Sequence, residues 1–248
     1  MLDDIFGLSL LEGEAMQKST ILIVQARMGS IRLPGKSMML INGKPLIMRV
    51  VDAIENYSLY DLCIATSESL DCDGLCNFLE SEKVRVFRGS ENNVLSRFAD
   101  ILSLKNYDNI IRITADDPCH SYRLIELGLL KFCQLDLDYF NSRSSVNNLP
   151  DGLGFEIFTN AMLKKVMLEY QLDKLSREHV TLRMRDGSIK LKSGSFSSSE
   201  VSEFTKGNQS LCIDTFDDYL KVNAAWDLIP GTKRPNTVQI IKNMEIKL

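Results

Sequence analysis

The 248-residue sequence has no run of apolar residues that approaches the roughly 20 needed to cross a bilayer. It also has no excess of basic residues, because 29 Lys and Arg stand against 33 Asp and Glu, for a net charge of −4. The first absence excludes a membrane-spanning helix, and the second argues against a nucleic-acid-binding protein. We therefore expect a globular protein whose partners include neither a membrane nor a nucleic acid.

Two further absences concern cysteine pairs and the N-terminus. The six cysteines include no Cys-x-x-Cys pair, and the spacing of Cys72 and Cys76 suits one face of a helix better than a zinc knuckle. Residues 1–17 contain no Lys or Arg, which a secretory signal peptide needs at its start. Together these features predict free thiols and a cytoplasmic location.

The length predicts one large domain with short additions at its ends. The expected segments are an N-terminal extension at residues 1–18, the domain at 19–230 and a C-terminal tail at 231–248. Two interpretations of the extension stay open: a translation start upstream of Met16, or an amphipathic helix with Ile5, Leu8 and Leu11 on one face. Because the extension carries none of the candidate site residues, we expect residues 1–15 to be dispensable for folding and activity.

Strand and helix patterns alternate through the first half of the chain. The expected strands are 20–26, 61–66, 84–88 and 108–114, and the expected helices are 45–57, 71–81, 93–105 and 121–133. Such alternation predicts an α/β fold of three layers, with helices on both faces of a mostly parallel sheet. The second half is less regular, and a mixed sheet edge is expected there. Its expected strands are 138–141, 155–158, 188–194 and 211–213, and its expected helices are 159–170, 174–186 and 216–229.

A glycine-rich, cationic loop follows the apolar run Ile21–Val24. Its cations and glycines are Arg27, Gly29, Arg32, Gly35 and Lys36. Exposed backbone N–H groups with Arg and Lys side chains suit phosphate oxygens, and the end of a strand is where open α/β sheets bind ligands. The loop differs from a Walker A motif because five residues separate its glycines instead of four, and Pro34 lacks an N–H. A solvated basic turn stays open as the alternative.

Carboxylates follow two of the expected strands. Asp116 and Asp117 come directly after strand 108–114, and Asp214 follows strand 211–213 about 100 residues later. Carboxylates at strand ends suit Mg²⁺, which prefers oxygen ligands, and adjacent residues of an extended chain point in opposite directions. We therefore expect one of the first pair to face the metal, with an Asx turn before a proline as the alternative interpretation. The Asp-x-Asp strings at 71–73 and 136–138 are expected to be helix caps or surface residues.

Several strings together resemble a known family. They are QARMGSIRLPGK from residue 25, Ala65-Thr66-Ser67, the segment 88–97, the Pro-Asp-Gly and Glu of 150–156, Arg-Glu-His-Val at 177–180, and Ile-Asp-Thr at 213–215. They are similar to the SpsF-like, spore-coat-polysaccharide branch of the cytidylyltransferases, which is related to the CMP-Kdo and CMP-sialic acid synthetases. Departures from the family pattern include Asn93 for Asp, Gly154 for a carboxylate and Phe216 for Pro.

The resemblance implies a Rossmann-like GT-A fold, Mg²⁺ as cofactor, CTP as co-substrate, and roles for individual residues. The implied catalytic residues are Arg27, Arg32 and Lys36. The implied nucleotide contacts are Gln25, Ala26, Gly29, Ser30, Thr66, Ser67, Ser90 and Arg97. The implied metal ligands are Asp116 and Asp214. The implied acceptor contacts are Asp151, Glu156, Arg177 and His179, although a structural role for His179 stays open.

The expected reaction is nucleotidyl transfer to a sugar, sugar acid or sugar phosphate for glycan biosynthesis, with release of pyrophosphate. The alternatives are a guanylyltransferase acting on a sugar 1-phosphate, a GT-A glycosyltransferase, and a non-catalytic nucleotide-binding subunit. The expected partners are small molecules, with a homodimer as an open possibility for the assembly. The sequence does not identify the acceptor.

Overall fold

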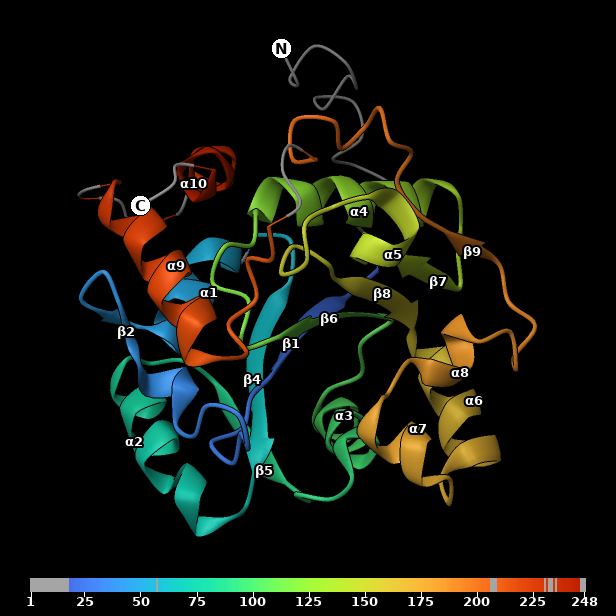
Figure 1. Cartoon of the computed structure of the whole chain (residues 1–248). Helices are drawn as coiled ribbons and strands as arrows, with labels where there is room; N and C mark the ends of the chain where they lie inside the picture. Colours follow the sequence, from blue (N-terminus) through green and yellow to red (C-terminus); the bar gives the residue numbers. More distant parts are fainter. Residues whose placement is uncertain are drawn as a thin grey trace.

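A seven-stranded mixed sheet forms the centre of the computed structural model, which describes residues 18–56, 58–205, 209–229, 231, 234 and 236–245 (Figure 1). The strand order is β5-β4-β1-β6-β8-β7-β9. The strands are β1 (Thr20–Gln25), β4 (Asp61–Ser67), β5 (Val86–Gly89), β6 (Asn109–Thr114), β7 (Tyr139–Asn141), β8 (Glu156–Thr159) and β9 (Ser193–Gly194). Strands β5, β4, β1 and β6 are parallel, while β8 runs antiparallel to both β6 and β7.

Strand β1 lies inside the sheet, between β4 and β6, because its apolar run can be buried on both faces. Residues Ile21 to Val24 are all fully buried. Ile21 and Ile23 pack into one hydrophobic cluster, and Leu22 and Val24 pack into the other, as the alternation of side chains in a strand requires. A continuous apolar strand is typical of a parallel sheet covered on both sides.

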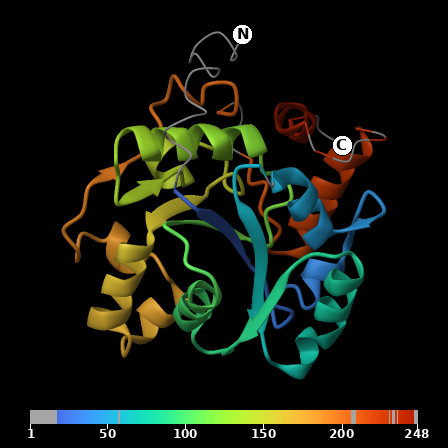
Figure 2. The ribbon, with the colours of Figure 1, turned by 180° about the vertical axis from the view of Figure 1, so that it is seen from behind.

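Helices cover both faces of the sheet (Figures 1 and 2). One face packs against α1 (Leu46–Ile54), α2 (Asp73–Ser81), α4 (Tyr122–Gln134), α9 (Phe216–Asp227) and α10 (Thr237–Met244). The other packs against α3 (Val94–Leu104), α6 (Asn160–Tyr170) and α8 (Leu182–Arg185), and α7 (Lys174–Glu178) lies against α3. The arrangement confirms the predicted three-layer α/β fold with a mostly parallel, mixed sheet.

The second half differs from the expectation in four places. The predicted helix 174–186 is interrupted, because Thr181 between α7 and α8 is fully buried and donates its hydroxyl to Glu156. Of the predicted strand 188–194, only the two residues of β9 form a strand. Residues 211–213, also predicted to be a strand, do not form one. The predicted loop 142–154 includes the short helix α5 (Ser144–Asn147).

Helix α10, which the sequence patterns did not predict, lies in the segment expected to be a tail. Its residues Ile240, Ile241 and Met244 join the core cluster beside α9. The amphipathic helix and the alternative start at Met16 fall within residues 1–17, which lie outside the described residues. All six cysteines are free thiols. No helix in the described part of the chain has the length and apolarity to span a membrane.

Candidate active site

Lys36 joins the cationic loop to both predicted metal-binding segments. Its Nζ donates hydrogen bonds to Oδ2 of Asp116 at 2.8 Å, to Oδ1 of Asp214 at 3.1 Å and to the carbonyl of Ile213 at 2.8 Å. The residue before it, Gly35, has a φ of 71°, a left-handed conformation that favours glycine and turns the chain into a short 3-10 helix at Lys36–Met38. The three segments therefore meet at one ammonium group.

The segment that carries Asp214 is placed by its neighbours. The amide of Ile213 donates to the carbonyl of Asp116, and the amide of Leu211 donates to the carbonyl of Asp151. Gly152 permits this close approach, because a Cβ at that position would lie 2.6 Å from the amide nitrogen of Cys212. Segment 211–214 is thus held by backbone hydrogen bonds and by one tight glycine contact.

Charge in this network is nearly balanced. Arg32 forms an ion pair with Asp214, with 2.8 Å between Nη2 and Oδ2, so that two cations face two carboxylates. Burial opposes the charge on Lys36, but the carboxylates of Asp116 and then Asp214 outweigh it and raise the Lys36 pKa above its ordinary value. Lys36 is therefore a fixed cation at neutral pH.

A capping box distinguishes Asp214, the predicted metal ligand, from the two acids in the first turn of α9. Thr215 accepts from the amide of Asp218, and Asp218 accepts from the amide of Thr215, which closes the first turn of the helix. Asp218 therefore serves the helix start, and Asp217 is exposed. Only Asp214 of the three acids contacts Lys36.

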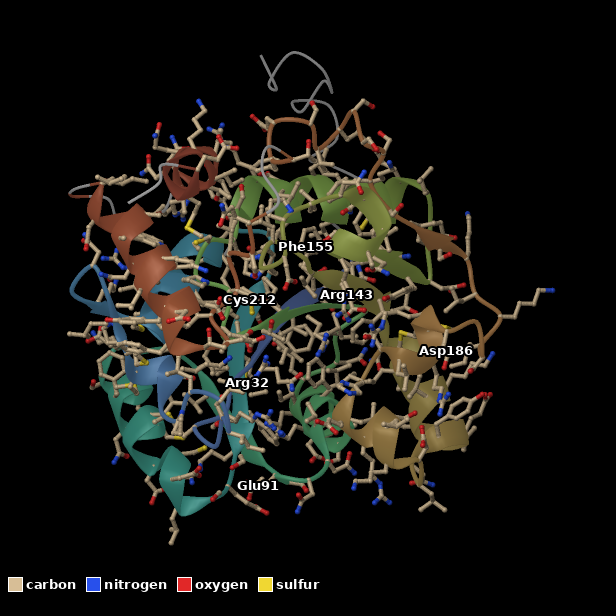
Figure 3. The ribbon with its side chains drawn as sticks, in the orientation of Figure 1. Arg32, Glu91, Arg143, Phe155, Asp186 and Cys212 are labelled. Atoms are coloured by element: carbon tan, nitrogen blue, oxygen red, sulfur yellow. The ribbon has the colours of Figure 1, made fainter. Side chains whose placement is uncertain are left out.

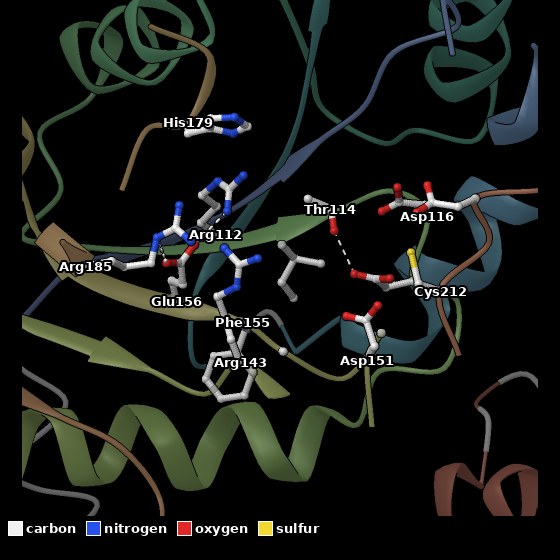
Figure 4. Close-up of a pocket in the computed structure, with 15 residues that line it drawn as sticks. Arg112, Thr114, Asp116, Arg143, Asp151, Phe155, Glu156, His179, Arg185 and Cys212 are labelled. Atoms are coloured by element: carbon white, nitrogen blue, oxygen red, sulfur yellow. Dashed lines mark hydrogen bonds and ion pairs between the residues drawn. The ribbon is translucent and has the colours of Figure 1, made fainter. Parts of the chain in front are cut away.

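A cavity of about 290 Å³ opens beside this network (Figure 4). One end is acidic and the other basic. The acidic end is lined by Asp116, Asp117, Asp151, Cys212 and Asp214, and the basic end by Arg112, Arg143, His179, Arg185 and the carboxylate of Glu156. A cavity with separate ends of opposite charge can hold a polar ligand in one orientation.

Glu156 holds the basic end together and is itself buried, at 1% exposure. It accepts hydrogen bonds from Arg112 at 2.7 Å, from Thr181 at 2.8 Å and from the hydroxyl of Tyr139, and Arg185 lies 3.5 Å away. Burial disfavours its charge, but the Arg112 guanidinium and the other partners outweigh burial and lower the Glu156 pKa. Glu156 is therefore an ionised anchor for two arginines.

Arg143 adds a third guanidinium to this end. It is exposed, it is directed toward the cavity in Figure 4, and its guanidinium forms no hydrogen bond or ion pair with the residues that the structure describes. The basic end thus holds three arginines and one carboxylate, Glu156, which pairs with Arg112 and Arg185. The basic end keeps an excess positive charge.

Asp117 is the buried acid of the acidic end. Its Oδ2 accepts from the Thr114 hydroxyl at 2.7 Å, while Oδ1 has no hydrogen-bond partner in the described part of the chain. Burial and then the charge of Asp116 raise the Asp117 pKa to about 8. Asp116 and Asp117 both line the cavity, and of the two Asp116 is the one that contacts Lys36.

A second group of predicted residues lies at the ends of β4 and β5. Thr66, Ser67 and Arg97 are all buried, and Arg97 is only 2% exposed. Its Nη1 lies 3.5 Å from the carbonyl of Ala65, its Nε has no partner among the described residues, and burial lowers its pKa. Gly89 makes room for this side chain, since a Cβ there would lie 2.9 Å from Cγ of Arg97. A buried guanidinium with a free N–H is ready to receive an acceptor atom from a ligand.

A family model described as cytidylyltransferase matches residues 21–225. The chain belongs to the cytidylyltransferase family. This confirms the resemblance found in the sequence motifs, and the match includes the cationic loop, the strand end at Asp116 and the start of α9.

One relative agrees with this assignment in sequence, and two solved structures share the fold. The spore coat polysaccharide biosynthesis protein SpsF of Bacillus subtilis is 30% identical over 211 residues, which cover 83% of this chain and 85% of SpsF. A solved cytidylyltransferase from Leptospira borgpetersenii superimposes with a TM-score of 0.82 at 24% identity, over 91% of this chain and 93% of that one. A CMP-2-keto-3-deoxy-manno-octonic acid synthetase solved with CTP gives a TM-score of 0.61 at 15% identity, over 85% and 99% of the two chains.

The predicted residues of this cytidylyltransferase fall into three groups in space. One group surrounds the cavity and contains Asp116, Asp151, Glu156, His179 and Asp214, with Lys36 and Arg32 bonded to its edge. A second group at the other strand ends contains Thr66, Ser67, Ser90 and Arg97. The third lies at the end of β1 and in the loop that follows, and contains Gln25, Ala26, Arg27, Gly29 and Ser30. In the view of Figure 3, Arg32 lies between Cys212 and Glu91, which belong to the first two regions.

Three of these predicted residues form hydrogen bonds with other residues of the chain. Gln25 accepts from Nη2 of Arg112 at 3.1 Å, and the amide of Ala26 donates to the carbonyl of Ala65. Arg177 does not line the cavity, and its Nε donates to the carbonyl of Gln171 at 2.7 Å. Arg177 is therefore not brought to the cavity with the other acceptor residues predicted for this cytidylyltransferase.

The sequence motifs missed the arginines of the basic end. Arg112 carried a usable signal, because it is a charged residue in the middle of the apolar strand β6. Arg143 and Arg185 carried none, because they lie in a polar loop and on a basic helix where exposed arginines are ordinary.

Proposed function

We propose that the protein transfers a cytidylyl group from CTP to an oxygen atom of a sugar-type acceptor and releases pyrophosphate. The acceptor oxygen attacks the α-phosphorus of CTP, a new oxygen–phosphorus bond forms, and the bond to pyrophosphate breaks. Chemistry of this kind depends mainly on positioning and electrostatic stabilisation, so it needs no covalent nucleophile.

The observation that carries the proposal is the contact of Lys36 with Asp116 and Asp214. A cation from the loop after β1 and carboxylates from two other segments converge at the carboxyl ends of the central strands. Arg32 extends this cationic side. We propose that Arg27, Arg32 and Lys36 bind the triphosphate and stabilise the departing pyrophosphate through fixed charge.

The residues at this point fit a Mg²⁺ ion. Asp116 and Asp214 supply oxygen ligands, and their side chains are 23% and 33% exposed toward the site. Their carboxylates already converge on one cationic atom, Lys36 Nζ. When bound, Mg²⁺ would neutralise charge on the substrate phosphates, and the chain would contribute Asp116 and Asp214 as its ligands.

The choice of CTP rests on the family and on the related synthetase solved with CTP. We propose that Thr66, Ser67, Ser90 and Arg97 contact the nucleoside from the ends of β4 and β5. The unpaired Nε of buried Arg97 supports this, because a buried donor without a partner is costly until a ligand supplies an acceptor.

The acceptor is proposed to carry an anionic group, a carboxylate or a phosphate. The basic end has three arginines for one carboxylate, and the Arg143 guanidinium has no protein partner in the described chain. Arginine forks pair well with both kinds of anion. Glycan biosynthesis as the setting is supported by the relative named for spore coat polysaccharide biosynthesis.

A pyrophosphate-release screen tests the proposal. Each of the four ribonucleoside triphosphates is incubated with Mg²⁺ and with neutral sugars, sugar acids or sugar phosphates. We expect release only with CTP and an anionic acceptor. Better turnover with GTP and a sugar 1-phosphate would identify a guanylyltransferase, and binding of an intact nucleotide sugar without pyrophosphate release would indicate a glycosyltransferase.

A pair of neighbouring substitutions tests the metal-binding role. Asp214→Asn keeps the shape of the side chain but removes the charge, so turnover should fall severely and more Mg²⁺ should be needed for half-maximal rate. Asp217→Asn is the control, because Asp217 is exposed in the first turn of α9 and should change stability by at most about 1 kcal/mol. Wild-type turnover and Mg²⁺ dependence in Asp214→Asn would contradict the proposed site.

A further inference from the structure

The acidic end of the cavity contains a thiol as well as carboxylates. The ligand atoms of Asp116, Asp117 and Cys212 all lie within 4.8 Å of one another. Cys212 is half-buried, and Figure 4 shows its sulfur at the same end of the cavity as Asp116 and Asp151. Three potential ligands of two chemical kinds thus face one small space.

An unsatisfied atom points to a missing ligand in this space. The side chain of Asp117 is 8% exposed, Thr114 satisfies its Oδ2, and its Oδ1 has no partner in the described part of the chain. A buried polar atom without a partner is rare in native proteins, because it forfeits its hydration without compensation. A cation bound between Asp117 and its neighbours would remove this cost.

The Cys212 thiol favours a cation that binds sulfur over one that binds only oxygen. Mg²⁺ takes oxygen ligands and rarely sulfur, whereas Zn²⁺ and related ions bind Cys sulfur at about 2.3 Å and carboxylate oxygen at about 2.0–2.2 Å. Tetrahedral ligands at these lengths stand about 3.5 Å apart. The ligand atoms of Asp116, Asp117 and Cys212 lie within 4.8 Å of one another, and rotamer changes that move them by about 1 Å bring them to that spacing.

We propose that Asp116, Asp117 and Cys212 form a binding site for a thiophilic divalent cation of the zinc class. Binding replaces the Cys212 thiol proton by a metal–sulfur bond and the proton held by the Asp117 carboxyl by a metal–oxygen bond, and the displaced protons go to solvent. The fourth position is open to water or to a substrate group. Because the site shares Asp116 with the proposed Mg²⁺ site, occupancy by zinc excludes the hard ion, so zinc acts as an inhibitor. The inhibition rests on the proposed function, while the binding does not.

Cobalt spectroscopy tests the binding without any turnover. Co²⁺ is titrated into the full chain in the absence of nucleotide and acceptor, and the sulfur-to-cobalt charge-transfer band is followed in the near ultraviolet. We expect one equivalent to produce the band, Zn²⁺ to abolish it at stoichiometric concentration by displacement, and Mg²⁺ to weaken it only at much higher concentration, because the two sites share Asp116. No band in the wild-type protein would overturn the proposal.

Matched variants identify the sulfur ligand. Cys212→Ser should lose the band, and Cys133→Ser should keep it, because Cys133 is a half-buried thiol on α4 that does not line the cavity. Asp117→Asn should weaken Zn²⁺ at least about tenfold in calorimetry, with circular dichroism confirming that each variant is folded. A band that persists in Cys212→Ser, or unchanged zinc affinity in both site variants, would refute the assignment.

The kinetic consequence is measured separately. Once turnover is available, Zn²⁺ should inhibit the wild-type protein at lower concentration than it inhibits Cys212→Ser, each compared with its own zinc-free rate. If no cytidylyl transfer is found but the cobalt band behaves as expected, the proposed function fails and the metal site stands. If transfer is found without a cobalt band, the metal site fails alone.

Discussion

Replacing Lys36 by Met removes the cation between two carboxylates while keeping much of the side-chain volume. In the wild-type protein, Nζ makes three hydrogen bonds, two of them to Asp116 and Asp214, and the side chain is 11% exposed. Lys36→Met leaves both carboxylates and the carbonyl of Ile213 without this donor. We therefore expect a loss of stability and a gain in cation affinity at the same place.

The size of the loss follows from burial. Breaking a fully buried ion pair costs about 3–5 kcal/mol, because the remaining charge has no partner. Asp116 and Asp214 are 23% and 33% exposed, so water can solvate part of their charge, and Arg32 still pairs with Asp214. We expect about 2–3 kcal/mol, which corresponds to a fall of roughly 5–10 °C in melting temperature for a domain of this size.

Magnesium should return part of this stability. A tenfold gain in Mg²⁺ affinity adds about 1.4 kcal/mol at saturation. Thermal denaturation with EDTA and with increasing Mg²⁺ measures both effects in one series. Turnover at saturating Mg²⁺ should still fall by about 10²-fold or more, because the metal does not replace a preorganised donor to the triphosphate.

Lys44→Met provides the matched control. Lys44 lies in the hairpin of β2 (Leu40–Ile41) and β3 (Lys44–Pro45) and forms an ion pair with buried Asp52 of α1. Neither residue lines the cavity. Lys44→Met should lose stability with no gain in the Mg²⁺ response and with near wild-type turnover. Equal Mg²⁺ responses in the wild type and both variants, or full activity in Lys36→Met, would refute the assigned role of Lys36.

Three further outcomes follow from the charges around the cavity. Because the folded-state pKa of Asp117 is raised to about 8, the stability that its protonated carboxyl contributes is lost as pH rises toward that value. The melting temperature of Asp117→Asn relative to wild type should therefore rise between about pH 5 and pH 8 in EDTA. A constant difference would contradict the raised pKa. Glu156→Gln should cost about 3 kcal/mol at neutral pH, since it leaves partly buried Arg112 without its carboxylate. The lowered Glu156 pKa means that this penalty shrinks in acid, and denaturation at two pH values checks it. Arg143→Ala should raise the KM for an anionic acceptor at least about tenfold and leave the KM for CTP and the melting temperature near wild type; an equal effect on both substrates would count against an acceptor role.

Local patterns explain how much of the fold was predictable. The first half follows the expected alternation because each strand and helix there is set by its own periodicity, as the buried run Ile21–Val24 illustrates. The break between α7 and α8 was not predictable, because it depends on a hydrogen bond from Thr181 to Glu156, which lies 25 residues earlier. Helix α10 was missed for a similar reason, since it depends on packing against α9.

The candidate site also has features that the sequence predicts and features that only the folded structure shows. The sequence by itself determined the α/β alternation, the cationic, glycine-containing character of the loop that carries Lys36, and the acidic strand end at Asp116, because these depend on neighbours within a few residues. Only the tertiary structure decided that Lys36 Nζ lies between Asp116 and Asp214, and that Arg143 faces the cavity while Arg177 does not. Such contacts join residues separated by up to 178 positions, and their geometry is set by the register of the sheet and by close approaches such as that of Gly152, which no local pattern encodes.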